Sequence, residues 1–391
     1  MCSSQTALDS HFSNMYQTDG SSSLTTRSYS KQPGLGKDRG MATNRNVTIN
    51  DVAAASGVSR ATVSRALSGY GRINQATIDH VQKVAESLGY KQNALAAALR
   101  AGKTKTIGLV VISDFTNAFF DRATKAIIDQ AKELGYRVLI SHTDEDVEVE
   151  KIAVDTMLSN QVDGLILVPS STKKHSHLTP KKLGNKPVVI IDRKLDTPRY
   201  TTITTGDEVA AEEAVLHAVE YGHSALGFLI AVPGIDGFTK TQPEIPITSV
   251  QERADGFLSG VQNCKPKPKS VSWLYCEGTE EAANAAVTSL LDSPKPPSII
   301  FTSNNDMLLA VLKVAGDRGI KIGKGLSVIS FDDSPWAAAM VPGITVVARP
   351  VEDLGHLAVT ELVSAIEGKP NHRQIVLPAH LIKRGSVAKL K

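Results

Sequence analysis

Several features that define particular classes of protein are scarce or missing in this sequence. Its 391 residues include only three cysteines, which are scattered, and this excludes a disulfide scaffold and a cysteine-based zinc cluster. No apolar run approaches the roughly 20 residues that a membrane-spanning helix needs. The first 30 residues have neither the basic start nor the apolar stretch of a secretory signal. We therefore expect a cytoplasmic protein with reduced cysteines.

An excess of charge of one sign is also missing. The chain has 43 Lys and Arg against 40 Asp and Glu, a net charge of +3, so net charge says little about partners. No Gly-x-Ser-x-Gly or Walker-type motif is present, and His175 and His177 have no third metal ligand near them in the sequence. We predict two or three domains with no enzymatic site, no metal and no cofactor.

Residues 1–46 differ from the rest of the chain. They are rich in serine and poor in large apolar residues, and patterned sequence begins only at Val47. Such a composition cannot bury enough apolar surface to offset the entropy of ordering the chain. We predict a disordered segment here, with Met41 as an alternative start of translation.

Short helical patterns occupy residues 47–92. Thr48 is a suitable N-cap for a first helix, and Gly57 marks a tight turn that requires a positive φ. A second helix opens at Ser59. The apolar spacing predicts a third helix over residues 75–88.

The second of these helices has the composition of a DNA-recognition helix. Between residues 45 and 105, nine basic residues stand against three acidic ones, a local charge of +6. A short helix, a glycine turn and a second helix that starts with arginine form the arrangement that places a helix in the major groove. Arg60 and Arg65 can reach base edges, and Ala61 can approach a thymine methyl group. The hydroxyl side chains can bond phosphates: Ser59, Thr62 and Ser64.

From residue 106 onwards, short apolar strands alternate with amphipathic helices. This alternation predicts parallel α/β sheets, and so many units over ~280 residues favour two lobes. The predicted strands are 107–112, 137–141, 164–168, 188–191, 225–229, 298–301 and 326–331. Helices are expected between them, for example over 121–134, 148–160, 208–220, 281–291 and 306–318.

Polar and aromatic side chains follow several of the predicted strands. Carboxyl ends of parallel strands meet at one edge of a sheet, so we expect these side chains to line a cleft for a small polar molecule. The candidates are Asn117, Phe119, Phe120, Asp192, Arg193, Asn305 and Asp332.

Three motifs carry a resemblance to a known family. They are Val-Thr-Ile-Asn-Asp-Val-Ala at 47–53, Gly-Val-Ser-Arg-Ala-Thr-Val-Ser-Arg at 57–65 and Gly-Tyr-Lys-Gln-Asn-Ala-Leu-Ala at 89–96. These motifs resemble the headpiece of lactose-repressor-type transcription regulators, and the resemblance extends to Arg384. It implies a small all-α helix-turn-helix headpiece over 47–92, a hinge helix and linker over 93–105, and a two-lobed α/β core of the periplasmic-binding-protein type over 106–391.

The resemblance also implies roles for single residues. Arg60, Ala61 and Arg65 match residues that read bases, and phosphates are held by the residues that match Thr48, Ser59, Thr62, Ser64 and Asn93. In the hinge helix, Ala96 and Leu99 join the DNA-binding set, with Leu99 as an apolar wedge in the minor groove. Arg253 matches an arginine that anchors the effector.

Three positions depart from the family pattern. Asn305 stands where the family usually has Asp, and Gly278 falls about where related sugar regulators carry an aromatic residue. Arg349 occupies a place often held by Gln, and we add it to the effector-binding residues. These departures leave room for a phosphate, carboxylate or nucleoside group near the arginines.

We predict a transcription regulator that represses a carbohydrate or nucleoside utilisation operon. It would bind a near-palindromic operator as a homodimer or tetramer and be released by a sugar, sugar phosphate or nucleoside. One alternative is a global catabolite-type regulator whose co-repressor is a phosphocarrier protein. Another is an α/β solute-binding protein, which would need a signal peptide and no basic headpiece.

Overall fold

The computed structural model describes residues 47–68, 72–90, 103–112, 118–232, 237–239, 245–369 and 372–390. The chain divides into a first unit that ends at Lys91 and a second that begins at Gln92, and each is described by itself. Within the described ranges, no helix combines the length and apolarity needed to cross a membrane. Some predictions fall outside these ranges: the segment 1–46 with its start at Met41, and the site residues Asn93, Ala96, Leu99 and Asn117.

Three short helices form the first unit, here called the headpiece: α1 (Ile49–Ser56), α2 (Arg60–Ser68) and α3 (Gln75–Ser87). The Asp51 carboxylate accepts hydrogen bonds from the backbone N–H and the hydroxyl of Thr48, which caps α1. Gly57 ends α1 with a φ of 69°, a left-handed conformation that glycine adopts at low cost. One valine from each helix is fully buried in the small core: Val52, Val63 and Val81.

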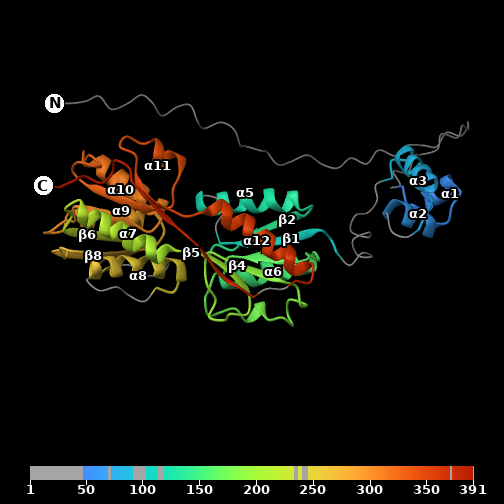
Figure 1. The fold of residues 1–391 in the computed structure, drawn as a ribbon, viewed down its shortest axis with the longest axis horizontal. Helices are drawn as coiled ribbons and strands as arrows, with labels where there is room; N and C mark the ends of the chain where they lie inside the picture. The colour runs from blue at the N-terminus through green and yellow to red at the C-terminus, as the bar shows by residue number, and fades with distance from the viewer. Residues whose placement is uncertain are drawn as a thin grey trace, which may run out of the picture. The chain divides into compact units, whose positions relative to one another are not determined.

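The second unit, here called the core, has two lobes, each a sheet with helices on both faces (Figure 1). In the N lobe the strand order is β12-β5-β4-β3-β1-β2, and all paired strands are parallel. Helices α5 and α12 cover one face and α6 covers the other. The elements are β1 (Thr106–Val111), α5 (Ala118–Glu133), β2 (Arg137–His142), α6 (Val147–Ser159), β3 (Leu165–Leu167), β4 (Val188–Ile191), β5 (Thr201–Thr205), α12 (Val351–Ile366) and β12 (Gln374–Leu377).

In the C lobe the strand order is β13-β11-β10-β9-β6-β8-β7, with the two edge strands antiparallel to their neighbours. Helices α7 and α8 pack on one face, and α9 and α10 pack on the other. The elements are α7 (Asp207–Glu220), β6 (Ala225–Ala231), β7 (Gly237–Thr239), α8 (Thr248–Asn263), β8 (Ser270–Cys276), α9 (Glu280–Leu291), β9 (Ile299–Thr302), α10 (Asn305–Asp317), β10 (Ser327–Phe331), α11 (Pro335–Ala339), β11 (Thr345–Ala348) and β13 (His380–Ile382).

Successive side chains of a strand enter different apolar clusters. Leu109 packs with α5 and α12, whereas its neighbour Val110 packs with α6. Because both faces of the sheet are covered, both sets of side chains are apolar, which explains the near-continuous apolar runs in the sequence. The predicted fold class, a helix-turn-helix headpiece with a two-lobed α/β core, is confirmed.

The chain passes between the lobes three times: from β5 to α7, from β11 to α12 and from β12 to β13. Asp207 lies at the first passage and Arg349 at the second. Side chains at these passages lie near both lobes, and Arg349 donates to an aspartate of each.

All seven predicted strands are present, with ends within two residues of the prediction. Six strands were not predicted from the sequence: β5, β7, β8, β11, β12 and β13. All residues of β5 are buried. Its sequence, Thr-Thr-Ile-Thr-Thr, lacks the aliphatic run that marked the others, yet β-branched threonine suits a buried strand when its hydroxyl is satisfied.

Candidate functional site

Helix α2 presents one polar face outward. Arg60, Ala61 and Arg65 are exposed, whereas Val63 and Ala66 are buried in the headpiece core. The three residues predicted to read bases therefore lie on the solvent side of α2. Since a recognition helix must insert its outward side chains into the major groove, this placement suits the predicted role.

Three of the predicted phosphate-binding hydroxyls lie at or near the starts of α1 and α2, and the fourth, that of Ser64, lies in the middle of α2. Ser59 Oγ accepts a hydrogen bond from the Thr62 backbone N–H, at 3.1 Å, and is 2.9 Å from the Thr62 hydroxyl. Thr48 is exposed at the start of α1, and Ser64 is half-buried on α2. The hydroxyl of Ser59 thus caps the start of α2 and contacts that of Thr62. A phosphate bound at this helix end would contact the same two hydroxyls.

A cleft of about 370 Å³ lies between the two lobes of the core. Six residues predicted from the sequence line it: Phe120, Asp192, Arg193, Arg253, Asp332 and Arg349. Phe119 and Asn305 do not line the cleft. Both are buried, and the Oδ1 atom of Asn305 has no hydrogen-bond partner in the described part of the chain.

Arg349 joins the two lobes through paired charges. Its Nη1 donates to Asp192 of the N lobe at 2.7 Å, and its Nε donates to Asp332 of the C lobe at 2.6 Å. A third carboxylate, Asp207, is 3.8 Å from Nη1. The guanidinium also stacks over the Phe119 ring, 3.5 Å from its centroid. Phe119 therefore supports an arginine and does not form the cleft wall that the sequence analysis expected.

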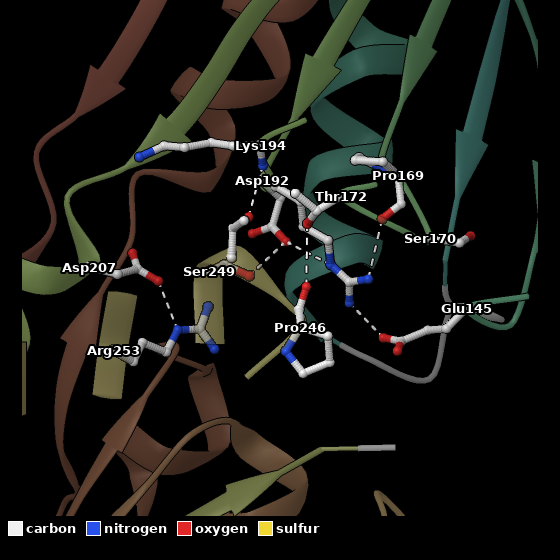
Figure 2. Close-up of polar contacts among 12 residues, drawn as sticks. Glu145, Pro169, Ser170, Thr172, Asp192, Lys194, Asp207, Pro246, Ser249 and Arg253 are labelled. Atoms are coloured by element: carbon white, nitrogen blue, oxygen red, sulfur yellow. Dashed lines mark hydrogen bonds and ion pairs between the residues drawn. The ribbon is translucent and has the colours of Figure 1, made fainter. Parts of the chain in front are cut away.

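Arg253 on α8 is held in a similar way. Its Nε donates to Asp207 at 2.7 Å and its Nη1 donates to the Ser303 carbonyl at 2.6 Å. Figure 2 shows Arg253 directed at Asp207, while Ser249 from the same helix contacts Asp192. The arginine predicted to anchor an effector is thus already paired with a buried carboxylate.

Arg193, the third arginine of the cleft, is bound on its N-lobe side. Its Nη2 donates to Glu145 at 2.6 Å and its Nη1 donates to the Pro169 carbonyl at 3.3 Å. Its Nε has no hydrogen-bond partner within the described residues. It forms an ion pair with a carboxylate oxygen of Asp192 at 3.9 Å.

The paired charges shift the protonation equilibria of their members. Burial alone would raise the pKa of Asp192, but the positive charges of Arg349, Arg253 and Arg193 outweigh it and lower that pKa. Burial likewise opposes the charge of Arg349, yet the surrounding aspartates raise its pKa above the usual value. Asp192 and Arg349 are therefore both charged at neutral pH.

Two aspartates of the network adopt backbone conformations that are rare for residues with a side chain. Asp192 has a φ of 65° and Asp332 a φ of 70°, each directly after a strand. Aspartate tolerates the left-handed region better than most residues, but the conformation still costs roughly 1 kcal/mol or more. Such strain is typical of residues whose carboxylates must point into a site.

Further bonds join the lobes at the rim of the cleft. The Lys194 backbone N–H donates to the Thr248 hydroxyl at 2.8 Å, and its side chain forms an ion pair with Glu252. The Thr172 hydroxyl donates to the Pro246 carbonyl at 3.3 Å (Figure 2). The lobes of this structure are therefore closed onto each other.

Several polar residues in or beside the cleft were not predicted from the sequence, among them Asp207, Ser249 and Asp306. Asp207 follows β5, and the rule used for the other strand ends would have found it had β5 been recognised. Ser249 lies on α8, whose position over the cleft depends on the fold. Asp306 stands beside Asn305 and lines the cleft where Asn305 does not.

Comparison with known proteins agrees with this architecture. The sequence pattern of bacterial regulatory proteins of the lacI family matches residues 48–93, and that of the periplasmic binding protein-like domain matches residues 215–387. HTH-type transcriptional regulator DegA of Bacillus subtilis (strain 168) is 30% identical over 346 residues, 88% of this chain and 98% of the relative. This chain belongs to the lacI family of bacterial regulatory proteins.

Two other proteins are similar to this chain over most of its length. Catabolite control protein A of Priestia megaterium is 29% identical over 338 residues, 86% of this chain and 98% of the relative. The Lac repressor dimer bound to operator and the anti-inducer ONPF shares the fold, with a TM-score of 0.75 and 23% identity over 88% of this chain and 100% of that one. The regulator thus binds DNA through its headpiece, and the predicted family is confirmed.

Proposed function

We propose that this regulator is a repressor that acts as a dimer in the cytoplasm and responds to a small polar effector in the interlobe cleft. It has a regulatory and not an enzymatic role, because the relative DegA is named as a transcriptional regulator. The observation that carries the proposal is the outward face of α2, where Arg60, Ala61 and Arg65 are exposed on the helix that the family pattern covers.

An exposed apolar edge supports the dimer. Strand β2 lies at one edge of the N-lobe sheet, and its residues Leu139 and Ile140 are more than a third exposed. Ile152 on the adjacent α6 is 66% exposed. An open edge strand with apolar neighbours is an aggregation hazard unless another chain covers it, and a second copy of this chain would do so.

The passages between the lobes support a coupling between effector and DNA. Asp207 and Arg349 belong both to these passages and to the charged network of the cleft. A ligand in the cleft would change these contacts and hence the closure of the lobes. By linkage, a ligand that lowers DNA affinity must bind the DNA complex more weakly, typically by about 1–3 kcal/mol.

The DNA-binding half of the proposal is tested by selection from random and genomic DNA with the full chain. We expect a near-palindromic site, because a two-fold symmetric dimer presents two copies of α2. Recovery of ligand binding without any specific DNA would instead favour a solute-binding protein. Operator binding that requires a phosphorylated carrier protein would favour the catabolite-type regulator.

The effector half is tested by narrowing the cleft without breaking a bond. Gly278 lines the cleft, its φ is not positive, and an added Cβ would meet nothing within 4 Å. Gly278→Phe should therefore fold and change the effector concentration that releases operator by about tenfold or more, whether by blocking or by stacking. Gly316→Phe is a matched control, since Gly316 also has open space but lies outside the cleft. Equal responses of the two variants would contradict an effector site in the cleft.

A further inference from the structure

The cleft carries more negative than positive side chains. Three arginines line it: Arg193, Arg253 and Arg349. Five carboxylates line it too: Asp144, Glu145, Asp192, Asp306 and Asp332. The buried Asp207 adds a further negative charge directly behind Arg253. The surplus charge of the cleft is therefore negative, although the sequence analysis drew attention to the arginines.

Each arginine has a carboxylate partner inside the protein. Arg349 binds Asp192 and Asp332, Arg253 binds Asp207, and the third pair is Arg193 with Glu145. An anionic ligand that recruited one of these guanidinium groups would displace a carboxylate and leave it without its counter-ion. Removing one partner of a buried ion pair is strongly unfavourable, so the arginines are poorly available to phosphate or carboxylate groups.

Of the two cleft carboxylates without an arginine partner, Asp144 lies 3.7 Å from Nε2 of His142. Asp306 is the other. It lies in the first turn of α10, and in the described part of the chain it has neither a hydrogen bond nor an ion pair. The side chain of Asp306 is exposed to solvent, and partial desolvation by neighbouring atoms together with the negative charge of Asp332 raises its pKa. A positive group placed beside it would remove this unfavourable interaction.

The hydrogen-bonding groups that remain are mostly acceptors. Carboxylates accept only, whereas Nε of Arg193 can donate and lies 3.9 Å from a carboxylate oxygen of Asp192. A hydroxyl group both donates and accepts, and an ammonium group donates to carboxylates. Ionised phosphate and carboxylate groups offer mainly hydrogen-bond acceptors, which cannot bond to the carboxylate acceptors of the cleft.

We infer that the effector is a small hydroxylated amine, and that Asp306 is the residue that receives its ammonium group. Arg349 and Arg253 act as built-in counter-ions that hold the carboxylates in place, and phosphorylated or carboxylated compounds are excluded. This inference rests on the proposed function, because it assigns a ligand class to the same cleft.

The test uses matched compounds on the full-length protein. Glucose, galactose and mannose are each compared with their 2-amino derivatives, uronates and 6-phosphates, by thermal shift and by release of operator DNA. We expect one amino sugar to bind about tenfold or more tightly than its neutral parent, with no response to the anionic members.

Other results of this panel would overturn the inference. If a uronate or a 6-phosphate bound most tightly, the inference that the effector is an amine would be wrong, although the cleft would still bind an effector. A shift caused by MgCl₂ and by none of the amines would identify the surplus charge as a metal site. The inference would also be rejected if no compound of the panel changed the thermal stability or the operator binding. Operator binding without any ligand would then still support the DNA-binding half of the proposed function.

A variant assigns the charge preference to one residue. Asp306→Asn keeps the size of the side chain and removes its charge, so the preference for the amine over its neutral parent should disappear. Glu281→Gln is the matched control, because Glu281 is an exposed carboxylate in the first turn of the neighbouring α9. A preference that survives Asp306→Asn, or that is lost in Glu281→Gln, would contradict the assignment.

Discussion

In the headpiece the arginines of α2 lie exposed, whereas in the core the arginines of the cleft are buried and paired. Arg60 and Arg65 are on the solvent side of α2. Arg253 and Arg349 are only 5% and 6% exposed, and each donates to a buried aspartate. In the sequence both sets are simply basic residues beside polar ones. A basic residue therefore indicates an anionic partner only where the fold has not already supplied one.

The two regions also differ in how much apolar structure supports them. The headpiece relies on one small cluster, to which each helix contributes few buried side chains. The core has an apolar cluster on each face of each sheet. A small unit buries a smaller share of its surface, so each buried side chain matters more to it.

The largest effect should come from removing a built-in counter-ion. Arg349→Gln leaves the buried Asp192 and Asp332 without their main partner, and we expect a loss of about 3–5 kcal/mol in the free energy of unfolding of the core. Urea unfolding followed by tryptophan fluorescence measures it, since Trp273 and Trp336 both lie in the C lobe. Arg318→Gln is the control, because it removes only the exposed ion pair between Arg318 and Asp292 and should change the free energy of unfolding little.

The loss in Arg349→Gln should also depend on pH. In the wild type, the pKa of Asp192 is lowered, so its contribution to stability is present above its unfolded pKa and is lost as pH falls through the folded value. Without Arg349 that contribution disappears, and the variant should differ most from the wild type at neutral pH and least in acid. A difference that is constant from pH 3 to pH 8 would mean that Arg349 acts through packing alone.

Removing the two γ-methyl groups of one buried valine should destabilise the headpiece without affecting the core. Val63 is fully buried in the headpiece, and Val63→Ala should cost about 2 kcal/mol of headpiece stability. Hydrogen exchange of residues 47–90 should rise, while the tryptophan-detected unfolding of the core stays unchanged. A simultaneous change in both would show that the two units unfold together.

The exposed arginines of the headpiece should affect binding and not stability. Arg65→Ala should reduce discrimination between operator and other DNA by about 1–3 kcal/mol if Arg65 reads a base. Binding titrations on the operator and on a scrambled site measure this. A loss that is equal on both DNAs would assign Arg65 to a phosphate, and the charge-preserving variant Arg65→Lys should then restore binding.

The smallest effect should be an acid sensitivity confined to the core. Burial lowers the pKa of His223, whose ring nitrogens contact Ser298 and the Ala388 carbonyl. When the pKa of a histidine is lower in the folded than in the unfolded state, the protein becomes less stable as pH falls below the unfolded pKa of about 6.5. Its free energy of unfolding then decreases by up to about 1.4 kcal/mol per pH unit. Unfolding of the core at pH 7.5 and 5.5 measures the loss, which should shrink in His223→Gln.

Much of the fold followed from local patterns. Strand–helix alternation predicted the parallel sheets, and Thr48 and Gly57 marked the ends of α1 as the structure has them. The strand-end rule brought Asp192, Arg193 and Asp332 to one cleft. It failed at β5, because a strand of threonines carries no aliphatic signal, and with β5 it missed Asp207.

The residue sequence by itself determined the periodicities, caps and turns, because these depend on neighbours within a few positions. It also determined which face of α2 is polar. Only the tertiary structure decided which charges neutralise one another. Arg349 and Asp192 are 157 positions apart, yet their atoms lie 2.7 Å apart. Since the energy of a charge pair depends on its distance and its burial, and both are set by the packing of the lobes, no local pattern could reveal that the arginines of the cleft already have partners.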